Sequence, residues 1–305
     1  MSSIELLQGR RVTEQAAAGT LIAASNLRFN TLTRFIRRNP TVAMGAAMLL
    51  TILLVALLAP YIAPGDPQAL NPVKRLRPPS REFWFGTDMY GRDVFTRTIH
   101  GSRISLLVGS IVAVVSVGVG LPIGLISGYA RVVDAIVMRI MDGLMAIPDI
   151  LLAIALMALT SASITNVVIA VTVPQVPRVV RLVRSVVLAI RDLPYIEAAH
   201  SIGTKFAGTV IKHVLPNTLA PLIVQATYTG AAAVLTEAGL SFLGAGTPPN
   251  IPSWGNIMAE GRGYFQIAVW IILFPGLFLA VTVLAVNLLG DGLRDALDPR
   301  LRRRM

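Results

Sequence analysis

The 305-residue chain has no cysteine, only three lysines and few charged residues for its length. Without cysteine it can form no disulfide, no thiolate metal site and no iron–sulfur cluster. Charged residues make up 14% of the chain, whereas soluble domains carry about 25%. Hydrophobic residues make up 54%, and the mean hydropathy is +0.68. This composition excludes a disordered chain and predicts an all-α integral membrane protein.

Motifs for enzyme chemistry are also missing. The three lysines follow Val73, Thr204 and Ile211, so the chain has no Gly-Lys pair and no Walker-type nucleotide site. The three histidines form no His-Glu-x-x-His pattern, and no serine lies in a Gly-x-Ser-x-Gly turn. We therefore expect neither catalysis nor a bound metal or other cofactor in this chain.

Long hydrophobic runs dominate the rest of the sequence. A helix that crosses a bilayer needs about 20 mostly apolar residues. Six runs meet this requirement, and we predict spans at 41–63, 104–128, 134–159, 163–187, 218–243 and 266–289. The third is interrupted by Arg139, Asp142 and Asp149. The chain is thus predicted to be one transmembrane domain, 40–305, preceded by a polar cytoplasmic arm, 1–39.

The basic residues indicate how these spans are oriented. Cytoplasmic loops of membrane proteins carry an excess of lysine and arginine. With a cytoplasmic N-terminus, 19 basic residues fall on the inner side and 8 on the outer side. We therefore predict a multi-pass protein of a bacterial inner membrane with both termini in the cytoplasm. The net charge of +11 then reflects loops beside the lipid bilayer, and nothing else in the sequence favours nucleic acid as a partner.

The polar segment 191–217, between the fourth and fifth spans, is too polar to cross a membrane. Pro194 can begin a helix, and Glu197 then lies in the first turn, where the helix dipole favours an acid. Gly203 can end that helix or allow a close backbone approach. A second helical run, 206–214, is predicted to stop at Pro216. The two short helices either bind a groove on another protein or merely cover the bundle.

The residues of this segment match a known pattern. Glu197-Ala198-Ala199-x3-Gly203-x9-His213-Val214-Leu215-Pro216 resembles the "EAA" loop of binding-protein-dependent ABC importer permeases, which usually carry isoleucine where this chain has His213. The resemblance implies that the segment is a coupling helix that docks into an ATPase subunit. The coupling residues it implies are Glu197, Ala198, Ala199, Gly203, Leu215 and Pro216.

Three further stretches are similar to one branch of this family, the C-type subunit of dipeptide, oligopeptide and nickel importers. The first begins Gly86-Thr87-Asp88-x2-Gly91-Arg92-Asp93 and continues through Arg97 to Leu106. The second runs from Glu237 to Gly244, with Trp254 following. The third is the tail from Asn287 to Arg300. Together they cover most of residues 40–302.

The resemblance implies a fold and a set of partners. The fold is a type I ABC importer permease bundle, MetI-like, with six transmembrane helices and a cytoplasmic coupling helix. The partners are a homologous B-type permease, two P-loop ATPase subunits that bind ATP and Mg, and an extracytoplasmic peptide-binding protein. The function implied is import of dipeptides or oligopeptides by alternating access. Glutathione and nickel chelates remain open as substrates.

An ion-coupled secondary transporter or channel is the alternative. Asp142, Asp149 and Glu237 are acids at possible membrane depth, where a charge is costly enough to indicate function. Asp142 follows Arg139 by three residues, so we expect these two side chains to pair. Gly120, Gly124 and Gly128 repeat every fourth residue and predict close helix packing inside the bundle.

Overall fold

The computed structural model describes residues 39–297, apart from the side chains of His200 and Phe206, and this part of the chain contains helices but no β-strand. Its long helices are α2 (Pro40–Leu57), α4 (Val94–Tyr129), α7 (Ile164–Ile190), α10 (Leu215–Phe242) and α12 (Trp270–Leu297). Nearly all of the predicted cytoplasmic arm, 1–39, and the last residues of the tail motif lie outside the described residues. The predicted all-α membrane bundle is confirmed.

Five of the helices are long and apolar enough to cross a membrane. A sixth crossing exists if α5 (Arg131–Met145) and α6 (Asp149–Ala158) together form one span, but their axes are bent by 89°. The residues predicted as the third span, 134–159, are therefore divided between two helices. Pro148 precedes α6, and a proline disfavours helical geometry in the residue before it, so the break falls at 146–148.

Among the described helices, α4 and α7 share the most extensive contact. The predicted glycine stripe lies at their contact, because a Cβ atom on Gly120, Gly124 or Gly128 would come within 2.4–2.7 Å of a valine side chain of α7. The facing valines are Val179, Val183 and Val187. The glycines allow the two backbones to approach, and their predicted role in helix packing is confirmed.

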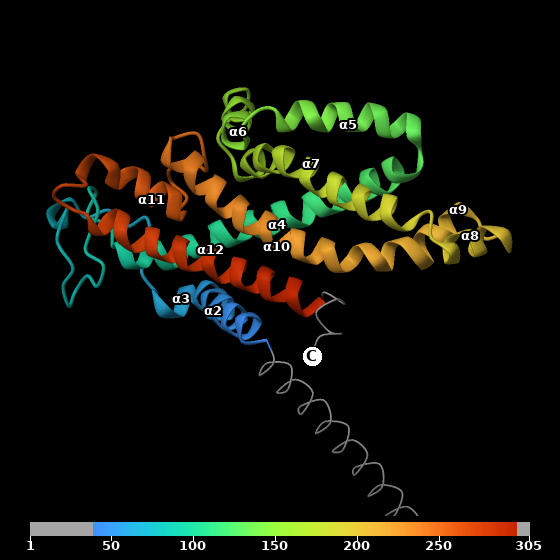
Figure 1. Ribbon diagram of the computed structural model, residues 1–305. Helices are drawn as coiled ribbons and strands as arrows, with labels where there is room; N and C mark the ends of the chain where they lie inside the picture. The colour runs from blue at the N-terminus through green and yellow to red at the C-terminus, as the bar shows by residue number, and fades with distance from the viewer. Residues whose placement is uncertain (1–38, 298–305) are drawn as a thin grey trace, which may run out of the picture.

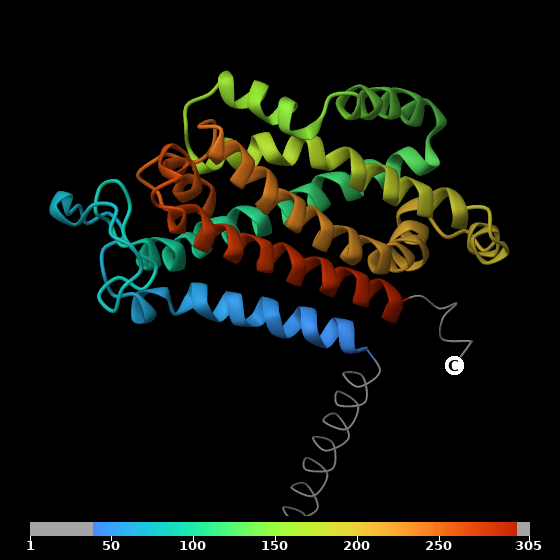
Figure 2. The ribbon, with the colours of Figure 1, turned by 60° about the vertical axis from the view of Figure 1, so that its left-hand side comes forward.

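A second pair forms along the other side of α10. Helix α2 lies beside α12, and α10 contacts both α4 and α12 (Figures 1 and 2). A Cβ atom on Gly45 would lie 2.5 Å from the backbone nitrogen of Leu289, so α2 and α12 also touch backbone to backbone. Leu58 ends α2, and the short helix α3 (Ala59–Ile62) continues the chain with Pro60 in its first turn. Helix α10 is thus held between the two pairs.

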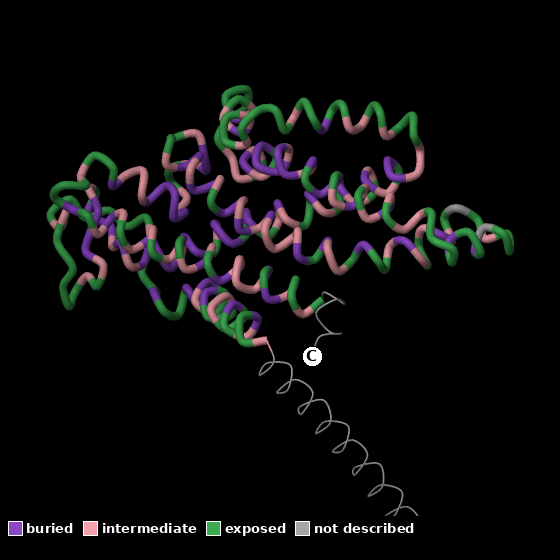
Figure 3. Tube along the Cα trace, viewed as in Figure 1, coloured by how far each residue is buried: buried purple, intermediate pink, exposed green. Residues whose placement is uncertain are grey.

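The polar segments gather at opposite ends of the bundle. The loop 64–93, with the short helix η1 (Pro72–Lys74), lies at one end together with α11 (Trp254–Gly261) and η3 (Arg262–Tyr264) (Figure 1). The segment with α8 (Pro194–Ser201) and α9 (Phe206–Thr209) lies at the other end. Figure 2 shows that α2 begins and α12 ends toward the α8 end. Figure 3 shows α5 as largely exposed on one side of the bundle.

Candidate functional site

Helix α8 carries the predicted coupling residues. Pro194 is its first residue, and Glu197 lies in its first turn. Ile196 and Ala199 are buried, whereas Glu197 and Ala198 are exposed. Because residues three apart share one face of a helix, α8 has one face toward the bundle and one toward solvent. The solvent face is small and carries one acid.

The buried face fixes α8 to the bundle. Ile196 is fully buried in a cluster with Val187 of α7 and Val214, which precedes α10. Arg191 donates from Nη1 to the carbonyl oxygen of Gly128 at 2.8 Å, which ties the chain after α7 to the end of α4. A displacement of α8 would therefore be transmitted to α4, α7 and α10 together. In Figure 1, α8 extends beyond the long helices.

Gly203 follows the end of α8, which is Ser201. Its φ of +81° lies in the left-handed region, which glycine adopts without steric cost. The N–H of Ile202 donates to the carbonyl of Ala198 at 3.1 Å, and that of Thr204 donates to the carbonyl of Ala199 at 3.0 Å. These two carbonyls in the last turn of α8 therefore have hydrogen-bond partners. No atom lies within 4 Å of a Cβ built at this position. Conformation, rather than close approach, is what requires glycine here.

The second helical run, predicted over 206–214, differs from its prediction. Helix α9, a π-helical turn η2 (Val210–Val214) and α10 follow one another without a break, so the helical run does not stop at Pro216. In this turn the N–H of Leu215 donates to the carbonyl of Val210, five residues back. Proline has no N–H and is tolerated in the first turn of a helix. Pro216 is therefore accommodated at the start of α10, where it is exposed and Leu215 is half-buried.

His213 connects η2 with α8. Its ring centroid lies 6.2 Å from that of Tyr195 in an edge-on arrangement. The imidazole is half-buried, between the buried Val214 and the exposed Lys212. Through this ring contact the two helical parts of the segment 191–217 touch each other.

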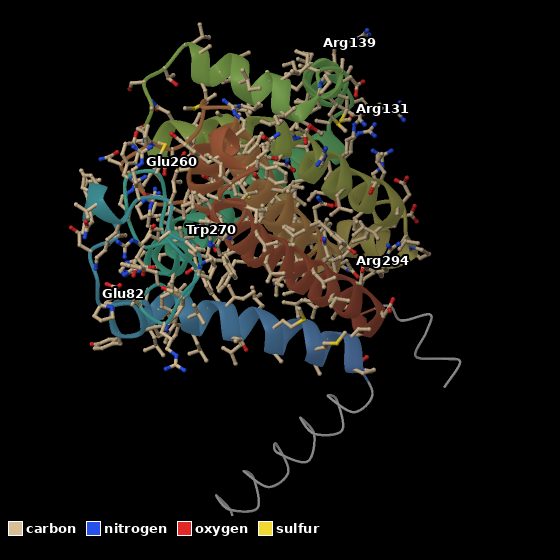
Figure 4. All side chains as sticks on the ribbon, turned by 90° about the vertical axis from the view of Figure 1, so that its left-hand side faces the viewer. Glu82, Arg131, Arg139, Glu260, Trp270 and Arg294 are labelled. Atoms are coloured by element: carbon tan, nitrogen blue, oxygen red, sulfur yellow. The ribbon has the colours of Figure 1, made fainter. Side chains whose placement is uncertain are left out.

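The opposite end of the bundle contains a buried ionic network. Asp88 accepts from Arg92 Nε at 2.6 Å and from Arg97 Nη1 at 2.7 Å, and both arginines also contact Glu260 of α11. Asp88 and Arg97 are buried, and Glu260 lies inside this end of the bundle in Figure 4. The network fastens the loop 64–93 to α11. The Gly86–Asp93 motif indicated its first half, but no sequence motif indicated Glu260.

The three acids of the ion-coupled alternative have protein partners. Glu237 is fully buried and accepts from Ser241 Oγ at 2.8 Å and from Ser105 Oγ at 3.4 Å. Asp149 pairs with Arg178 at 2.7 Å. Asp142 pairs with Arg181 of α7, so the predicted pair with Arg139 is wrong.

The Arg139 prediction failed because α7, and not α5 itself, provides the cation. Figure 4 shows Arg139 directed away from the bundle.

Among the described residues, no group of three or more histidine, cysteine, aspartate or glutamate side chains is arranged to hold a metal ion.

Comparison with known proteins identifies the family. A family model described as "Binding-protein-dependent transport system inner membrane component" matches residues 120–303. The chain belongs to this family. A second model, the "N-terminal TM domain of oligopeptide transport permease C", matches residues 31–79 of the permease. The permease is thus a multi-pass membrane component of an ABC transporter.

Named relatives of the permease are similar over most of their length. A probable peptide ABC transporter permease of Sinorhizobium fredii is 53% identical over 275 residues, covering 90% of this chain and 94% of that protein. A putative peptide transport system permease of Brucella abortus is 46% identical, over 88% and 91%. A dipeptide transport system permease of Alkalihalophilus pseudofirmus is 42% identical, over 88% of each.

A solved structure has the same fold. The MetNI methionine ABC transporter in an inward-facing conformation aligns with a TM-score of 0.56 and 23% identity. The alignment covers 67% of the permease and 97% of that chain. The MetI-like bundle implied by the sequence resemblance is confirmed.

Proposed function

We propose that the permease imports dipeptides or oligopeptides as one of two transmembrane subunits of an ATP-driven complex. The second would be a homologous B-type permease. Two P-loop ATPase subunits would bind ATP and Mg, and an extracytoplasmic binding protein would deliver the peptide. The substrate class rests on the names of relatives with 42–53% identity over about nine tenths of the chain.

The geometry of α8 is the observation that carries this proposal. A short helix with a fixed inner face and a small, exposed outer face is suited to insertion into a groove of another protein. Glu197 and Ala198 lie on the outer face, and Ile202 beside them is 83% exposed. Leu193, Tyr195 and Ile211 of the same segment are exposed as well, and a group of exposed apolar side chains favours a protein partner at this end of the bundle.

The proposed orientation follows from the same segment. If ATPase subunits bind α8, the α8 end is cytoplasmic, and so are the start of α2 and the end of α12 (Figure 2). The loop 64–93 and α11 then face the binding protein outside. The permease would lie in a bacterial inner membrane with both termini in the cytoplasm.

Alternating access follows from how α8 is attached. Closure of the ATPase dimer would move α8, and Ile196 would carry that movement to α7 and α10 through its buried cluster. To change the bundle from almost wholly one conformation to almost wholly the other, nucleotide must favour the second by about 5.5 kcal/mol. No nucleotide need bind this chain.

The proposal is tested with the tagged permease co-expressed with its neighbours, extracted in mild detergent and reconstituted in liposomes. We expect a second permease and P-loop ATPases to co-purify, and peptide uptake to require ATP and the binding protein. Glu197→Lys should reduce peptide-stimulated ATP hydrolysis at least tenfold, because it reverses a charge in a docked interface. Asp295 is an exposed acid in α12, at the same end of the bundle as α8. Asp295→Lys is the matched control and should leave peptide-stimulated ATP hydrolysis nearly unchanged.

Two outcomes would contradict the proposal. Uptake that continues without ATP would favour the ion-coupled carrier, as would loss of uptake only when Asp142 or Glu237 is neutralised. Unchanged coupling in both Glu197→Lys and Gly203→Val would reduce the segment 191–217 to a cover over the bundle.

A further inference from the structure

A row of three arginines runs along α7, and each one pairs with an aspartate of α5 or α6. The arginines recur every third residue, so they share one face of the helix. The pairs are Arg178–Asp149 at 2.7 Å, Arg181–Asp142 at 2.5 Å and Arg184–Asp134 at 2.6 Å. The aspartates occur in the reverse order along the chain, so that Asp149 pairs with the first arginine and Asp134 with the last.

Two of these pairs are exposed at the depth of a membrane. Helix α7 has 27 residues and is about 40 Å long, and Arg178 lies near its middle. The side chains of Arg178 and Arg181 are 42% and 44% exposed, and those of their partners Asp149 and Asp142 are 28% and 57% exposed. Charges at this depth are too costly to face lipid and are found facing protein or a water-filled cavity. This face of the permease therefore does not contact lipid tails.

The helix break beside the row supports the same conclusion. Residues 146–148 leave the helical path between α5 and α6, and all three are exposed in the isolated chain. Irregular backbone at membrane depth is tolerated only inside protein or along a water-filled cavity. Asp149 is the first residue after this break, so its carboxylate lies where the chain already requires water or polar partners.

The site around Arg178 is held from behind by a buried amide. Gln175 is buried and donates from Nε2 to Asp149 Oδ2 at 3.2 Å, while its Oε1 accepts from Arg178 Nη1 at 3.3 Å. The amide orients both charged groups while leaving part of each accessible. A guanidinium and a carboxylate side by side are complementary to a molecule that carries both charges.

We propose that Arg178 and Asp149 bind the charged ends of a peptide in transit, Arg178 the terminal carboxylate and Asp149 a terminal ammonium. The inference rests on the proposed function and assigns a substrate contact within it. When no peptide is present the two side chains neutralise each other. Because exposed ion pairs are weak, a substrate can replace the partner on each side.

The third pair provides a contrast within the same row. Arg184 contacts Asp134 through both Nε and Nη2, and each side chain is less exposed than its counterpart, Arg178 or Asp149. Two-point contact of this kind is stronger and geometrically fixed. Arg184 and Asp134 therefore serve structure and are the matched control for Arg178 and Asp149.

The test compares uptake of two versions of one peptide, with a free C-terminal carboxylate and with a C-terminal amide, in proteoliposomes that hold the complete complex. The neutral pair Arg178→Gln with Asp149→Asn leaves no unpaired charge. We expect it to lower uptake of the free carboxylate peptide about tenfold relative to the amide, as for loss of one charge-assisted contact. Because the binding protein is the same throughout, a change in this ratio reports on the permease.

The controls separate the possible outcomes. Arg184→Gln with Asp134→Asn should leave the ratio unchanged, and Arg178→Lys should keep most of it because the charge remains. An unchanged ratio in the neutral Arg178 pair, or equal loss of both peptides, would overturn the inference. Absence of ATP-dependent uptake by the wild-type complex would instead overturn the proposed function.

A second measurement does not require transport. The chain has no cysteine, so Arg178→Cys provides its only thiol. We expect a charged, membrane-impermeant methanethiosulfonate to modify it in the assembled complex, detected as a mass shift of this chain. A thiol that stays unmodified would show that water does not reach position 178, and would overturn the inference even if the neutral pair failed to fold.

Discussion

At the scale of single residues, the contact between α4 and α7 depends on glycines, which have no side chain to hold the helices apart. Gly124 has no room for a side chain, because a Cβ atom there would meet Val183 at 2.7 Å and also the backbone carbonyl of Val180 at 2.8 Å. We expect Gly124→Leu to destabilise the permease by at least 1–3 kcal/mol, the usual cost of overpacking. A lower midpoint of thermal unfolding in detergent would report it.

The same helix provides the control for this prediction. Gly118 has no atom within 4 Å of a built Cβ, so Gly118→Leu adds the same side chain to an open surface. Its unfolding midpoint should match that of the wild type. Equal destabilisation by both variants would mean that α4 and α7 do not depend on this close approach.

At the scale of elements, the turn after α8 determines where the proposed coupling helix points. A residue with a β-branched side chain at φ +81° is strained, whereas asparagine tolerates the left-handed region. We therefore expect Gly203→Val to lower ATP hydrolysis coupled to transport severalfold, as for about 1–2 kcal/mol of strain. Gly203→Asn should retain most of the coupling. If both variants coupled equally well, the left-handed turn would have no part in orienting α8.

Local sequence signals predicted some elements well and others poorly. Pro194, Glu197 and Gly203 correctly gave the start, first turn and end of α8, because each acts on its own backbone. Pro216 led to a wrong prediction of a helix end, because the π-helical turn before it lets the helix continue into α10. No residue pattern indicated that turn. Pro148 lay within a run that hydropathy alone read as one span, although its backbone restriction indicated a break.

At the scale of the whole molecule, hydropathy and motifs were sufficient for the fold, but side-chain partners were not predictable. Glu260 pairs with Arg92 and Arg97, which lie 168 and 163 residues earlier in the chain, and no local sequence pattern gives information over such a separation. For the same reason Asp142 was assigned to Arg139, its neighbour in sequence, and not to Arg181 of α7. Partner choice of this kind depends on how helices pack.

The orientation of the whole permease gives the last prediction. Val73, in the loop 64–93, is 84% exposed, and Ile202, after α8, is 83% exposed, so the two form a matched pair at opposite ends of the bundle. In this cysteine-free chain, an impermeant maleimide applied to intact spheroplasts should label Val73→Cys. It should label Ile202→Cys only after the membrane is permeabilised.

Partner binding adds a second condition to that labelling. Co-expression of the ATPase subunits should protect Ile202→Cys, because the proposed docking covers the outer face of α8, and should leave Val73→Cys as reactive as before. Labelling of Ile202→Cys from outside would reverse the orientation and remove α8 from the reach of cytoplasmic ATPases. Labelling from inside without protection would keep the orientation but place the ATPase contact elsewhere on the permease.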